Sequence, residues 1–316
     1  MNLGIINNIR DYHDRRVEKA VKKFSQFDGI HFLDIGAAGD VDPRWKAIKR
    51  YINYYGFEPD VRSIKTLMEN KNEFKTYQIF PQAVWDKNDN LNFNLTNKPE
   101  VSSFFEPNKE LLLKFPDYKR FEIKSVNSLS TTKIDDIKLS EVDFMKIDVQ
   151  GGELNVLNGA TNTMNRVFGL EVEIEFLQIY KGQPLFGEIN DWLFKRNFEF
   201  IEFLKLYRWE RHQLKGYGQC VFADALFLKM PEYINFNLLS DEKIKSYLSI
   251  LLLYKRFDLI DKSFEMFSND KRNLLSGFID EVENVRKWDK YVRNLNSYSN
   301  KLFSIFGRNY SSHLLH

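Results

Sequence analysis

The apolar positions of this chain follow two different periods. In the first two-thirds, up to about Pro231, short apolar runs of strand length alternate with helical stretches. The expected strands cover residues 30–35, 51–57, 74–84, 142–148, 168–176, 198–206 and 219–228. Between the third and the fourth of them, the asparagine- and lysine-rich stretch 86–100 predicts a hairpin and a loop. Strands that alternate with helices indicate βαβ units, so the pattern predicts an α/β fold with a mostly parallel sheet.

Helical periodicity follows Pro231 and also precedes the first strand. In both regions apolar residues recur at steps of three and four, which places them on one face of a helix. Near the N-terminus this face comprises Ile6, Ile9, Val17, Val21 and Phe24, and after Pro231 it begins with Ile244, Tyr247, Leu248, Leu251 and Leu252. The sequence therefore predicts an N-terminal helical segment (1–29), an α/β domain (30–230) and a C-terminal helical extension (231–316).

The composition is typical of a globular protein and argues against several classes. Of the 316 residues, 43% are hydrophobic and 28% are charged, which supplies enough apolar material for a core. No apolar run approaches the roughly 20 residues that cross a bilayer, and the first residues lack the apolar run of a secretory signal. A single cysteine, Cys220, fits a reducing compartment, so we expect a cytoplasmic protein. The net charge of +2 does not indicate a nucleic-acid partner.

The first expected strand ends in a carboxylate and a turn of small residues. Asp34 is followed by a turn that includes Gly36, Ala37 and Gly39, where the backbone can approach a ligand closely. Dinucleotides and S-adenosylmethionine are both bound by turns of this kind, and the dinucleotide fingerprint G-x-G-x-x-G is absent. S-Adenosylmethionine is a zwitterion with a sulfonium cation, so carboxylates and close backbone suit it.

A second carboxylate, Glu58, follows the second expected strand. It lies about 20 residues after Gly36, where a carboxylate can accept hydrogen bonds from both ribose hydroxyls of either cofactor. A purely structural interpretation is open for both acids. Asp34 would then cap the following helix, and Glu58 would be a solvated charge in a loop.

Three motifs together resemble the FkbM family of S-adenosylmethionine-dependent methyltransferases. They are Asp34-Ile35-Gly36-Ala37, Gly56-Phe57-Glu58-Pro59 and the stretch 142–160, which contains Lys146-Ile147-Asp148-Val149-Gln150-Gly151-Gly152-Glu153. Shorter blocks of the resemblance occur in family order at 82–86, 102–103, 173–176, 180–186 and 223–227. The resemblance runs from about residue 30 to residue 229. It implies a Rossmann-like class I methyltransferase fold with a seven-stranded, doubly wound sheet, to which the C-terminal helical extension is added.

The chain departs from the family pattern at two positions. Family members commonly carry glutamate where this chain has Gln150, and asparagine where it has Ala38. The resemblance therefore assigns no role to these two side chains. The glycines that shape the backbone of the motifs are retained.

The resemblance implies roles for the residues of its motifs. S-Adenosylmethionine would be bound by Asp34, Gly36, Ala37, Gly39, Glu58, Pro59, Gln82, Ala83 and Asp86. In this arrangement Asp34 lies near the methionine amino group, Glu58 binds the ribose, and either Asp86 or the backbone around Gln82 faces the adenine. Ser102, Ser103, Tyr180 and Asp224 are candidates for contact with the acceptor. The implied reaction is O-methylation of a hydroxyl on a saccharide or a glycan precursor.

Asp148 is the first candidate for a general base. A protonated hydroxyl is a poor nucleophile, and ligands of open α/β sheets bind outside the carboxyl ends of the strands, where Asp148 is expected. Glu171, Glu173 and Glu175 share one face of the fifth strand, and Glu173 is the second candidate. Asp148, Glu173 and Asp224 could also hold a divalent cation, but single carboxylates dispersed along a chain do not favour a metal site.

Two other classes of protein remain open, and so does the role of the tail. One is a nicotinamide-dependent oxidoreductase, which the missing glycine fingerprint disfavours; the other is a non-catalytic methyltransferase-like scaffold that recruits partners. Residues 284–316 combine basic and apolar side chains at helical spacing. This segment could pack on its own domain, lie on the inner face of an anionic membrane or contact a second copy of the chain. Besides that contact, the expected partner is a small-molecule or glycan acceptor.

Overall fold

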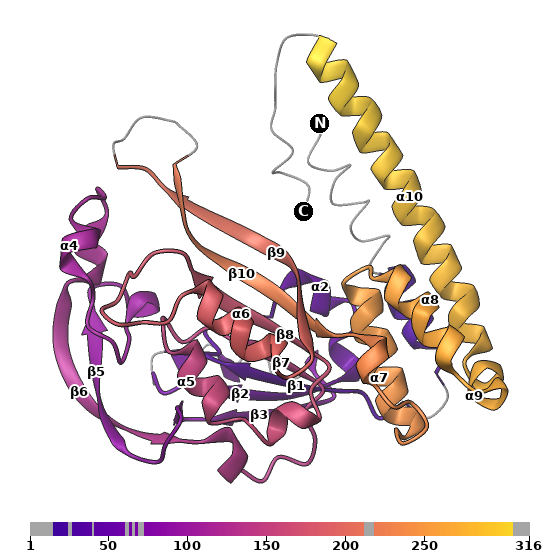
Figure 1. The fold of residues 1–316 in the computed structure, drawn as a ribbon, viewed down its shortest axis with the longest axis horizontal. Helices are drawn as coiled ribbons and strands as arrows, with labels where there is room; N and C mark the ends of the chain where they lie inside the picture. The colour runs from indigo at the N-terminus through magenta and orange to yellow at the C-terminus, as the bar shows by residue number, and fades with distance from the viewer. Residues whose placement is uncertain are drawn as a thin grey trace. The chain divides into compact units, whose positions relative to one another are not determined.

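The sheet predicted from the sequence is present. The computed structural model describes residues 15–24, 27–39, 41–60, 63–64, 67–68, 73–211 and 218–305. Within this part of the chain, seven strands form one sheet in the order β3-β2-β1-β7-β8-β10-β9 (Figure 1). β1 pairs in parallel with both β2 and β7, so the strand order reverses beside β1. This arrangement confirms the seven-stranded, doubly wound sheet.

The strands begin and end close to the predicted limits. They are β1 (Ile30–Ile35), β2 (Ile52–Phe57), β3 (Thr76–Phe80), β7 (Phe144–Ile147), β8 (Gly169–Glu175), β9 (Phe198–Trp209) and β10 (Gln219–Lys229). β10 runs antiparallel to β8 and to β9, and the remaining neighbours are parallel. The prediction of one strand over 74–84 is wrong, because β3 ends before Pro81 and the short β4 (Ala83–Val84) joins another sheet. Proline has no amide hydrogen for a strand ladder.

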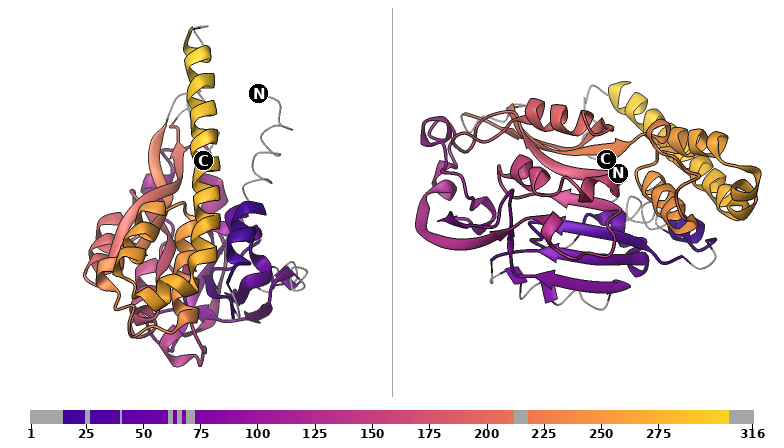
Figure 2. Two further views of the ribbon diagram at one scale, coloured as in Figure 1. Left: turned by 90° about the vertical axis from the view of Figure 1, so that its right-hand side faces the viewer. Right: turned by 60° about the horizontal axis from the view of Figure 1, so that its bottom comes forward.

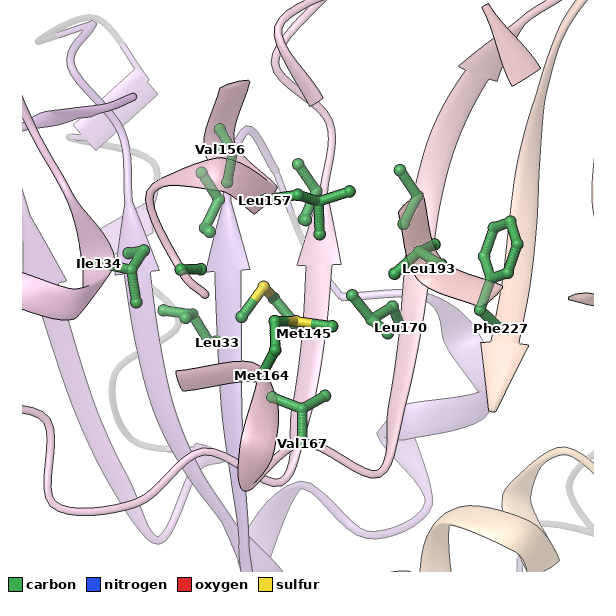
Figure 3. Packing of buried hydrophobic residues seen from close by; sticks show 14 of the residues in the cluster. Leu33, Ile134, Met145, Val156, Leu157, Met164, Val167, Leu170, Leu193 and Phe227 are labelled. Atoms are coloured by element: carbon green, nitrogen blue, oxygen red, sulfur yellow. The ribbon is translucent and has the colours of Figure 1, made fainter. Parts of the chain in front are cut away.

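One face of the large sheet bears the main hydrophobic core. Side chains alternate along a strand, so Leu33, Met145 and Leu170, which are register partners, point to the same side (Figure 3). Helices α5 (Glu153–Asn158) and α6 (Phe186–Phe194) cover this face and add Leu157 and Leu193 to the same buried cluster.

The opposite face changes character along the strands. Near their starts it is aromatic, and Phe32 of β1 stacks on Phe144 of β7 with ring centroids 5.6 Å apart. Two residues further on, Asp34 is the register partner of Lys146, which is in turn the partner of Glu171. Charged side chains therefore gather at the carboxyl edge of the sheet, on the side away from α5 and α6.

A second sheet, with strand order β4-β6-β5, was not predicted. β5 (Asn90–Thr96) pairs antiparallel with β6 (Ile123–Thr132), a long strand that curves strongly in Figure 2, and α4 (Lys109–Leu112) lies between them in sequence. The predicted hairpin in 86–100 is therefore wrong, since the partner of β5 comes from a distant segment. β6 is largely exposed and rich in serine and threonine, so its apolar period is weak.

The described residues divide into two compact units. One holds both sheets and comprises the described residues within 29–40 and 50–234; the other is helical and comprises the described residues within 1–28, 41–49 and 235–316. Residues 41–49, between β1 and β2, thus belong to the helical unit by their contacts. The predicted domain limits at 30 and 230 remain predictions.

The helical unit is built from short helices and one long one. They are α2 (Pro43–Lys46), α7 (Asp241–Leu253), α8 (Phe257–Met266), α9 (Asn269–Leu274) and α10 (Ser276–Ile305), the single rod seen in both views of Figure 2. Residues 15–21 are helical too, with Val17 and Val21 buried, while Ile6 and Ile9 lie outside the described residues. In the part of the chain that the structure describes, no helix is long and apolar enough to cross a membrane.

Candidate active site

The candidate site lies at the carboxyl ends of β1 and β7, where the strand order reverses. The loops after these two strands touch, and the Asp148 amide donates to the Ile35 carbonyl oxygen at 3.0 Å. Gly36 has a φ of 80°, and a Cβ there would clash with the backbone carbonyl of Asp148. Glycine is therefore required at this turn, both for its φ and for the space. Open α/β sheets bind their ligands at such a point.

The turn after β1 is anchored at one end and open at the other. The amides of Gly36 and Ala37 both donate to the carbonyl oxygen of Phe57, at 3.0 and 3.1 Å. Gly39 is exposed, with a φ of 99° and no described atom within 4 Å of the position of a Cβ. A ligand can thus approach the backbone of this turn from the open side.

Asp34 is buried in an ion pair beneath the turn. Its carboxylate accepts a hydrogen bond from the Tyr54 hydroxyl at 2.8 Å and lies 3.5 Å from the Lys146 ammonium. Lys146 also lies 3.8 Å from Asp148. Burial lowers the pKa of Lys146, but the charges of Asp34, Asp148, Glu171 and Asp224 outweigh it and the net pKa is raised. Lys146 is therefore a permanent cation that joins the ends of β1 and β7.

Glu58 is also buried, at the end of β2. It accepts a hydrogen bond from the Asp60 amide at 2.7 Å, as expected of a carboxylate that shapes its own turn. Burial raises the pKa of Glu58 to about 7, and the charges of Asp60, Asp34 and Asp148 contribute in the same direction. The structure therefore does not bear out the alternative of a solvated loop charge.

Asp148 and Glu173 are brought together by a residue that the sequence left without a role. The amide nitrogen of Gln150 donates to Asp148 Oδ1 at 2.9 Å and to Glu173 Oε2 at 2.7 Å. Asp148 is about one-third exposed, whereas Glu173 is buried. Burial raises the pKa of Glu173 well above its usual range, and neighbouring acids add to the effect, first among them Asp148. Asp148 is thus the carboxylate that a ligand can reach.

Three buried glutamates converge behind Asp148. Carboxylate oxygens of Glu153, Glu173 and Glu175 all lie within 4.8 Å of one another, the spacing of metal ligands. This group shares only Glu173 with the set considered from the sequence. Burial raises the pKa of Glu153 to about 7 and raises the pKa values of Glu173 and Glu175 well above their usual range, so bound protons can balance their charge.

The polar groups of the four candidates for acceptor contact already interact with other groups of the protein. The Ser102 hydroxyl lies 3.1 Å from the Thr96 amide, and the Ser103 hydroxyl donates to the Gln150 carbonyl oxygen at 2.7 Å. Asp224 lies 3.7 Å from the Lys205 ammonium and opposite Glu173 in the ladder.

Tyr180 is the fourth of these candidates, and it lies beside the Gln150 amide. Its hydroxyl is 3.1 Å from Gln150 Oε1 and 2.9 Å from the Val101 carbonyl oxygen, so one proton is shared between two acceptors. Ser103 and Tyr180 therefore both support Gln150.

The remaining candidates for cofactor contact lie along the edge toward β3 and β4. Pro59 continues the turn of Glu58 and is half-buried, Gln82 is exposed, and Ala83 is buried in β4. The Asp86 carboxylate accepts a hydrogen bond from the Asn155 side chain of α5 at 2.8 Å. An interaction of Asp86 with adenine would thus compete with a bond inside the protein, which favours the backbone around Gln82.

The described residues fit S-adenosylmethionine. The turn 36–39 has no side chain larger than methyl, and it meets a sheet edge rich in carboxylates, which suits a sulfonium zwitterion. The buried Glu58 carboxylate follows β2 at the distance along the chain expected for a ribose acceptor. Asp34, already paired with Lys146, would reach the cofactor's amino group only by sharing its carboxylate.

Two central residues of the site were not selected from the sequence. Lys146 interrupts an apolar strand, and its position two residues before Asp148 puts it on the same face, so alternation could have identified it. Gln150 was set aside because it differs from the family pattern. Its contacts depend on a φ of 59°, which no sequence period predicts.

A doubly wound sheet whose order reverses beside a glycine turn, with carboxylates at the ends of β1, β2 and β7, is the Rossmann-like architecture of class I methyltransferases. The profile of the methyltransferase FkbM domain matches residues 34–200, more than half of the chain. The protein belongs to the FkbM methyltransferase family.

The sequence identity between this chain and individual relatives is low. The chain is 26% identical over 172 residues to the 2-O-methyltransferase NoeI of Sinorhizobium fredii, which covers 51% of this chain and 70% of that protein. Methyltransferase FkbM from Methylobacillus flagellatus is similar at 12% identity with a TM-score of 0.39, over 65% of this chain and 44% of that one. A precorrin-6y C5,15-methyltransferase from Geobacter metallireducens matches at 11% identity with a TM-score of 0.33, over 66% and 86%. This chain thus spans less than half of the Methylobacillus structure.

Proposed function

We propose that the protein is an S-adenosylmethionine-dependent O-methyltransferase that acts on a hydroxyl of a saccharide or a glycan precursor. The observation that carries this proposal is the placement of Asp148. Its carboxylate is partly exposed beside the glycine turn of an FkbM domain, with one oxygen near Gln150 and the other near Lys146. A carboxylate held in this way is oriented and available to take a proton.

The proposed chemistry is an in-line displacement. When bound, S-adenosylmethionine supplies a methyl group activated by its positive sulfur. The acceptor oxygen forms a bond to the methyl carbon while the carbon–sulfur bond breaks, its electron pair stays on sulfur, and the hydroxyl proton passes to Asp148. The residues of this chain contribute alignment, exclusion of water and the proton acceptor. Lys146 stays charged throughout, and burial raises the pKa of Glu173 well above its usual range.

A sugar acceptor is supported by the aromatic surroundings of the site. From Tyr180, beside Gln150, ring contacts continue through Phe121 to Trp209, with centroids 6.0 and 5.9 Å apart. The Arg120 guanidinium lies 4.7 Å from the Trp209 ring. Tyr180 and Phe121 are buried in a hydrophobic cluster, so Trp209, which is only partly buried, is the ring of this row that can meet the apolar face of a sugar. The relative NoeI, by its name a 2-O-methyltransferase, supports an oxygen acceptor.

The proposal is tested by methyl transfer from labelled S-adenosylmethionine to a panel of saccharides, lipid-linked sugars and polyketide alcohols. We expect label in at least one saccharide, released by chemical cleavage of an O-methyl ether and accompanied by stoichiometric S-adenosylhomocysteine. Label in no hydroxyl acceptor, together with failure to bind S-adenosylhomocysteine, would favour the non-catalytic scaffold. Label only in a non-sugar alcohol would leave the methyltransferase and reject the saccharide.

Replacement of Asp148 in the same assay tests its role as the base. Asp148→Asn keeps the size of the side chain and one of its two oxygen contacts, to Lys146 or to Gln150, but cannot take up a proton. We expect turnover to fall by about 100-fold or more while the dissociation constant of S-adenosylhomocysteine changes little. A loss of affinity with unchanged turnover would place Asp148 in cofactor binding instead.

The partners proposed for the whole chain follow from the same activity. Besides the acceptor, we propose a contact of residues 284–316 with an anionic membrane surface or with a second copy of the chain, in a cytoplasmic protein. The cytoplasmic location rests on the single cysteine. A lipid-linked glycan acceptor would give a membrane contact a purpose. We propose no nucleic-acid partner and no resident metal.

A further inference from the structure

Gln150 has an unusual backbone conformation, and its side chain lies at the centre of the site. Gln150 has a φ of 59°, in the left-handed region that side chains other than glycine and asparagine rarely adopt. The conformation is held from outside, because the Ser103 hydroxyl donates to the Gln150 carbonyl oxygen at 2.7 Å. Gly151 follows with a φ of 97°. Backbone strain of this kind persists where the surroundings hold the residue in place. Here the strained conformation directs the side-chain amide of Gln150 toward Asp148 and Glu173.

Each polar atom of the Gln150 side-chain amide faces a suitable hydrogen-bond partner. Its nitrogen has two hydrogens and faces two carboxylates, Asp148 at 2.9 Å and Glu173 at 2.7 Å. Its oxygen faces a hydroxyl donor, Tyr180, at 3.1 Å. The reversed amide would place its oxygen against both acids and its hydrogens against the phenol, so the orientation is fixed by the contacts.

The surroundings are rich in acids. Asp148 and Glu173 are faced by charged or titratable groups of several elements: Glu58 after β2, Lys146 of β7, Glu153 of α5, Glu175 of β8 and Asp224 of β10, with Tyr180 in the loop after β8. Asp34 of β1 and Glu171 of β8 face Lys146. Burial raises the pKa of Tyr180, so its hydroxyl remains protonated and a donor. A group placed between Asp148 and Glu173 must therefore be a cation, a proton or a neutral donor, and Gln150 is a neutral donor.

We propose that Gln150 is a positioning residue for the general base: it bridges Asp148 to Glu173 and keeps the Asp148 carboxylate aimed at the acceptor hydroxyl. The inference rests on the proposed function and deepens it. Gln150 acts through Asp148 and does not itself contact the methyl group. Tyr180 fixes the amide, and Ser103 fixes the backbone beneath it.

The test uses Gln150→Glu, which is nearly isosteric, introduces the residue that family members commonly carry and, in the surroundings of this chain, puts a third carboxylate between Asp148 and Glu173. The added charge favours protonation of its neighbours, so the acidic limb of the kcat profile should shift upward by about one pH unit or more. We expect kcat to fall about tenfold near neutral pH and to recover as the pH rises, with S-adenosylhomocysteine affinity within about twofold of wild type. Tyr180→Phe, which frees the amide, should lower kcat less and leave the affinity unchanged.

Gln178→Glu is the matched control, because it adds the same charge at an exposed position of the loop after β8. Its pH profile should follow the wild type. An unchanged profile of Gln150→Glu, or a kcat lowered equally at every pH, would overturn the inference and leave the proposed function standing.

Thermal stability, whose measurement needs no turnover, tests the role of Gln150 separately from the proposed function. The melting temperature of Gln150→Glu should fall progressively below that of the wild type from about pH 6 to pH 9, while Gln178→Glu runs parallel to it. If the wild type transfers no methyl group, the proposed function fails, and the melting curves still decide whether Gln150 separates the two acids. Parallel curves for Gln150→Glu would show that it does not.

Discussion

At the scale of single residues, the site is organised by groups that keep carboxylates apart. Lys146 lies between Asp34 and Asp148, and Gln150 lies between Asp148 and Glu173. An isolated buried carboxylate is costly, and each of these contacts lowers that cost by a charge or a hydrogen bond. Asp148 is therefore the carboxylate of this group whose oxygen a substrate can reach.

Glu58 provides a prediction about pH. Burial raises its pKa to about 7. Ribose hydroxyls donate hydrogen bonds, so they prefer the ionised carboxylate, and binding of the cofactor should lower the pKa of Glu58 and release protons. Calorimetry with S-adenosylhomocysteine should therefore show affinity that weakens as the pH falls below about 7, by up to about tenfold per pH unit.

The control for this prediction is Glu58→Gln. The amide does not titrate in this range, so the variant should bind more weakly than wild type above about pH 7, with an affinity that no longer depends on pH there. A wild-type affinity that is flat between about pH 6 and pH 8 would show that Glu58 does not bind the ribose.

The sequence predicts residues of this site best where they lie in a motif or at a strand end. Asp34, Gly36, Glu58 and Asp148 all lie at the carboxyl edge, as expected from parallel strands. The pairing of Asp34 with Lys146 was not predicted, because it joins side chains from strands that are distant in the chain. Such contacts depend on register, which the apolar pattern alone does not determine.

At the scale of elements, helix α5 carries the motif that connects the site to the core. It is flanked by Gly152 and Gly159, and both approach Trp85. A Cβ on Gly152 would clash with the Trp85 ring, and one on Gly159 would clash with the Trp85 carbonyl oxygen. The two glycines therefore allow α5 to lie against the start of the second sheet, with Glu153 directed into the buried acidic group.

This packing predicts a cost for Gly159→Ala. A methyl group against a backbone carbonyl cannot be relieved by a side-chain rotation, so we expect a loss of about 1–3 kcal/mol in the free energy of unfolding. The measurement is urea denaturation, followed by far-ultraviolet circular dichroism.

Gly187→Ala serves as the comparison, since Gly187 lies in α6 with no described atom within 4 Å of a Cβ. It should be neutral or stabilising by up to about 1 kcal/mol, because alanine favours a helix. Equal stabilities for the two variants would contradict the close packing of α5 on Trp85.

The elements also show where sequence patterns fail. Buried strands such as β1 and β8 have continuous apolar runs, and they were predicted to within a residue or two. β6 has exposed polar residues on both faces for most of its length, so no period distinguishes it from a loop. Because β6 was not predicted, the sequence indicated a local hairpin for the segment that contains β5. The structure pairs β5 with β6 instead.

At the scale of the whole molecule, the tail is the part least explained by the proposed chemistry. The first half of α10 is packed within the helical unit, where Val282 and Val285 are buried. Arg286 pairs with Asp261 at 2.6 Å, and Asp289 pairs with Lys255 at 2.9 Å. Beyond Val292 the sequence holds three arginines and lysines and no acid.

A truncation after Val292 tests the proposed contact of this tail without removing the buried residues. We expect the shortened chain to bind S-adenosylhomocysteine like the full chain and to sediment less with vesicles of phosphatidylglycerol, while neither form sediments with neutral vesicles. Equal sedimentation and equal molecular mass of the two forms would show that the tail contacts neither a membrane nor a second copy.

The central claim is that the turn after β1 binds S-adenosylmethionine, and calorimetric titration tests it most directly. Wild-type protein should bind S-adenosylmethionine and S-adenosylhomocysteine at one site per chain and should not bind NAD. Gly36→Val should bind none of them, because its side chain would clash with the Asp148 carbonyl, whereas Gly187→Ala should bind like wild type. Binding of NAD by the wild type, or undiminished S-adenosylhomocysteine binding by Gly36→Val, would contradict the account.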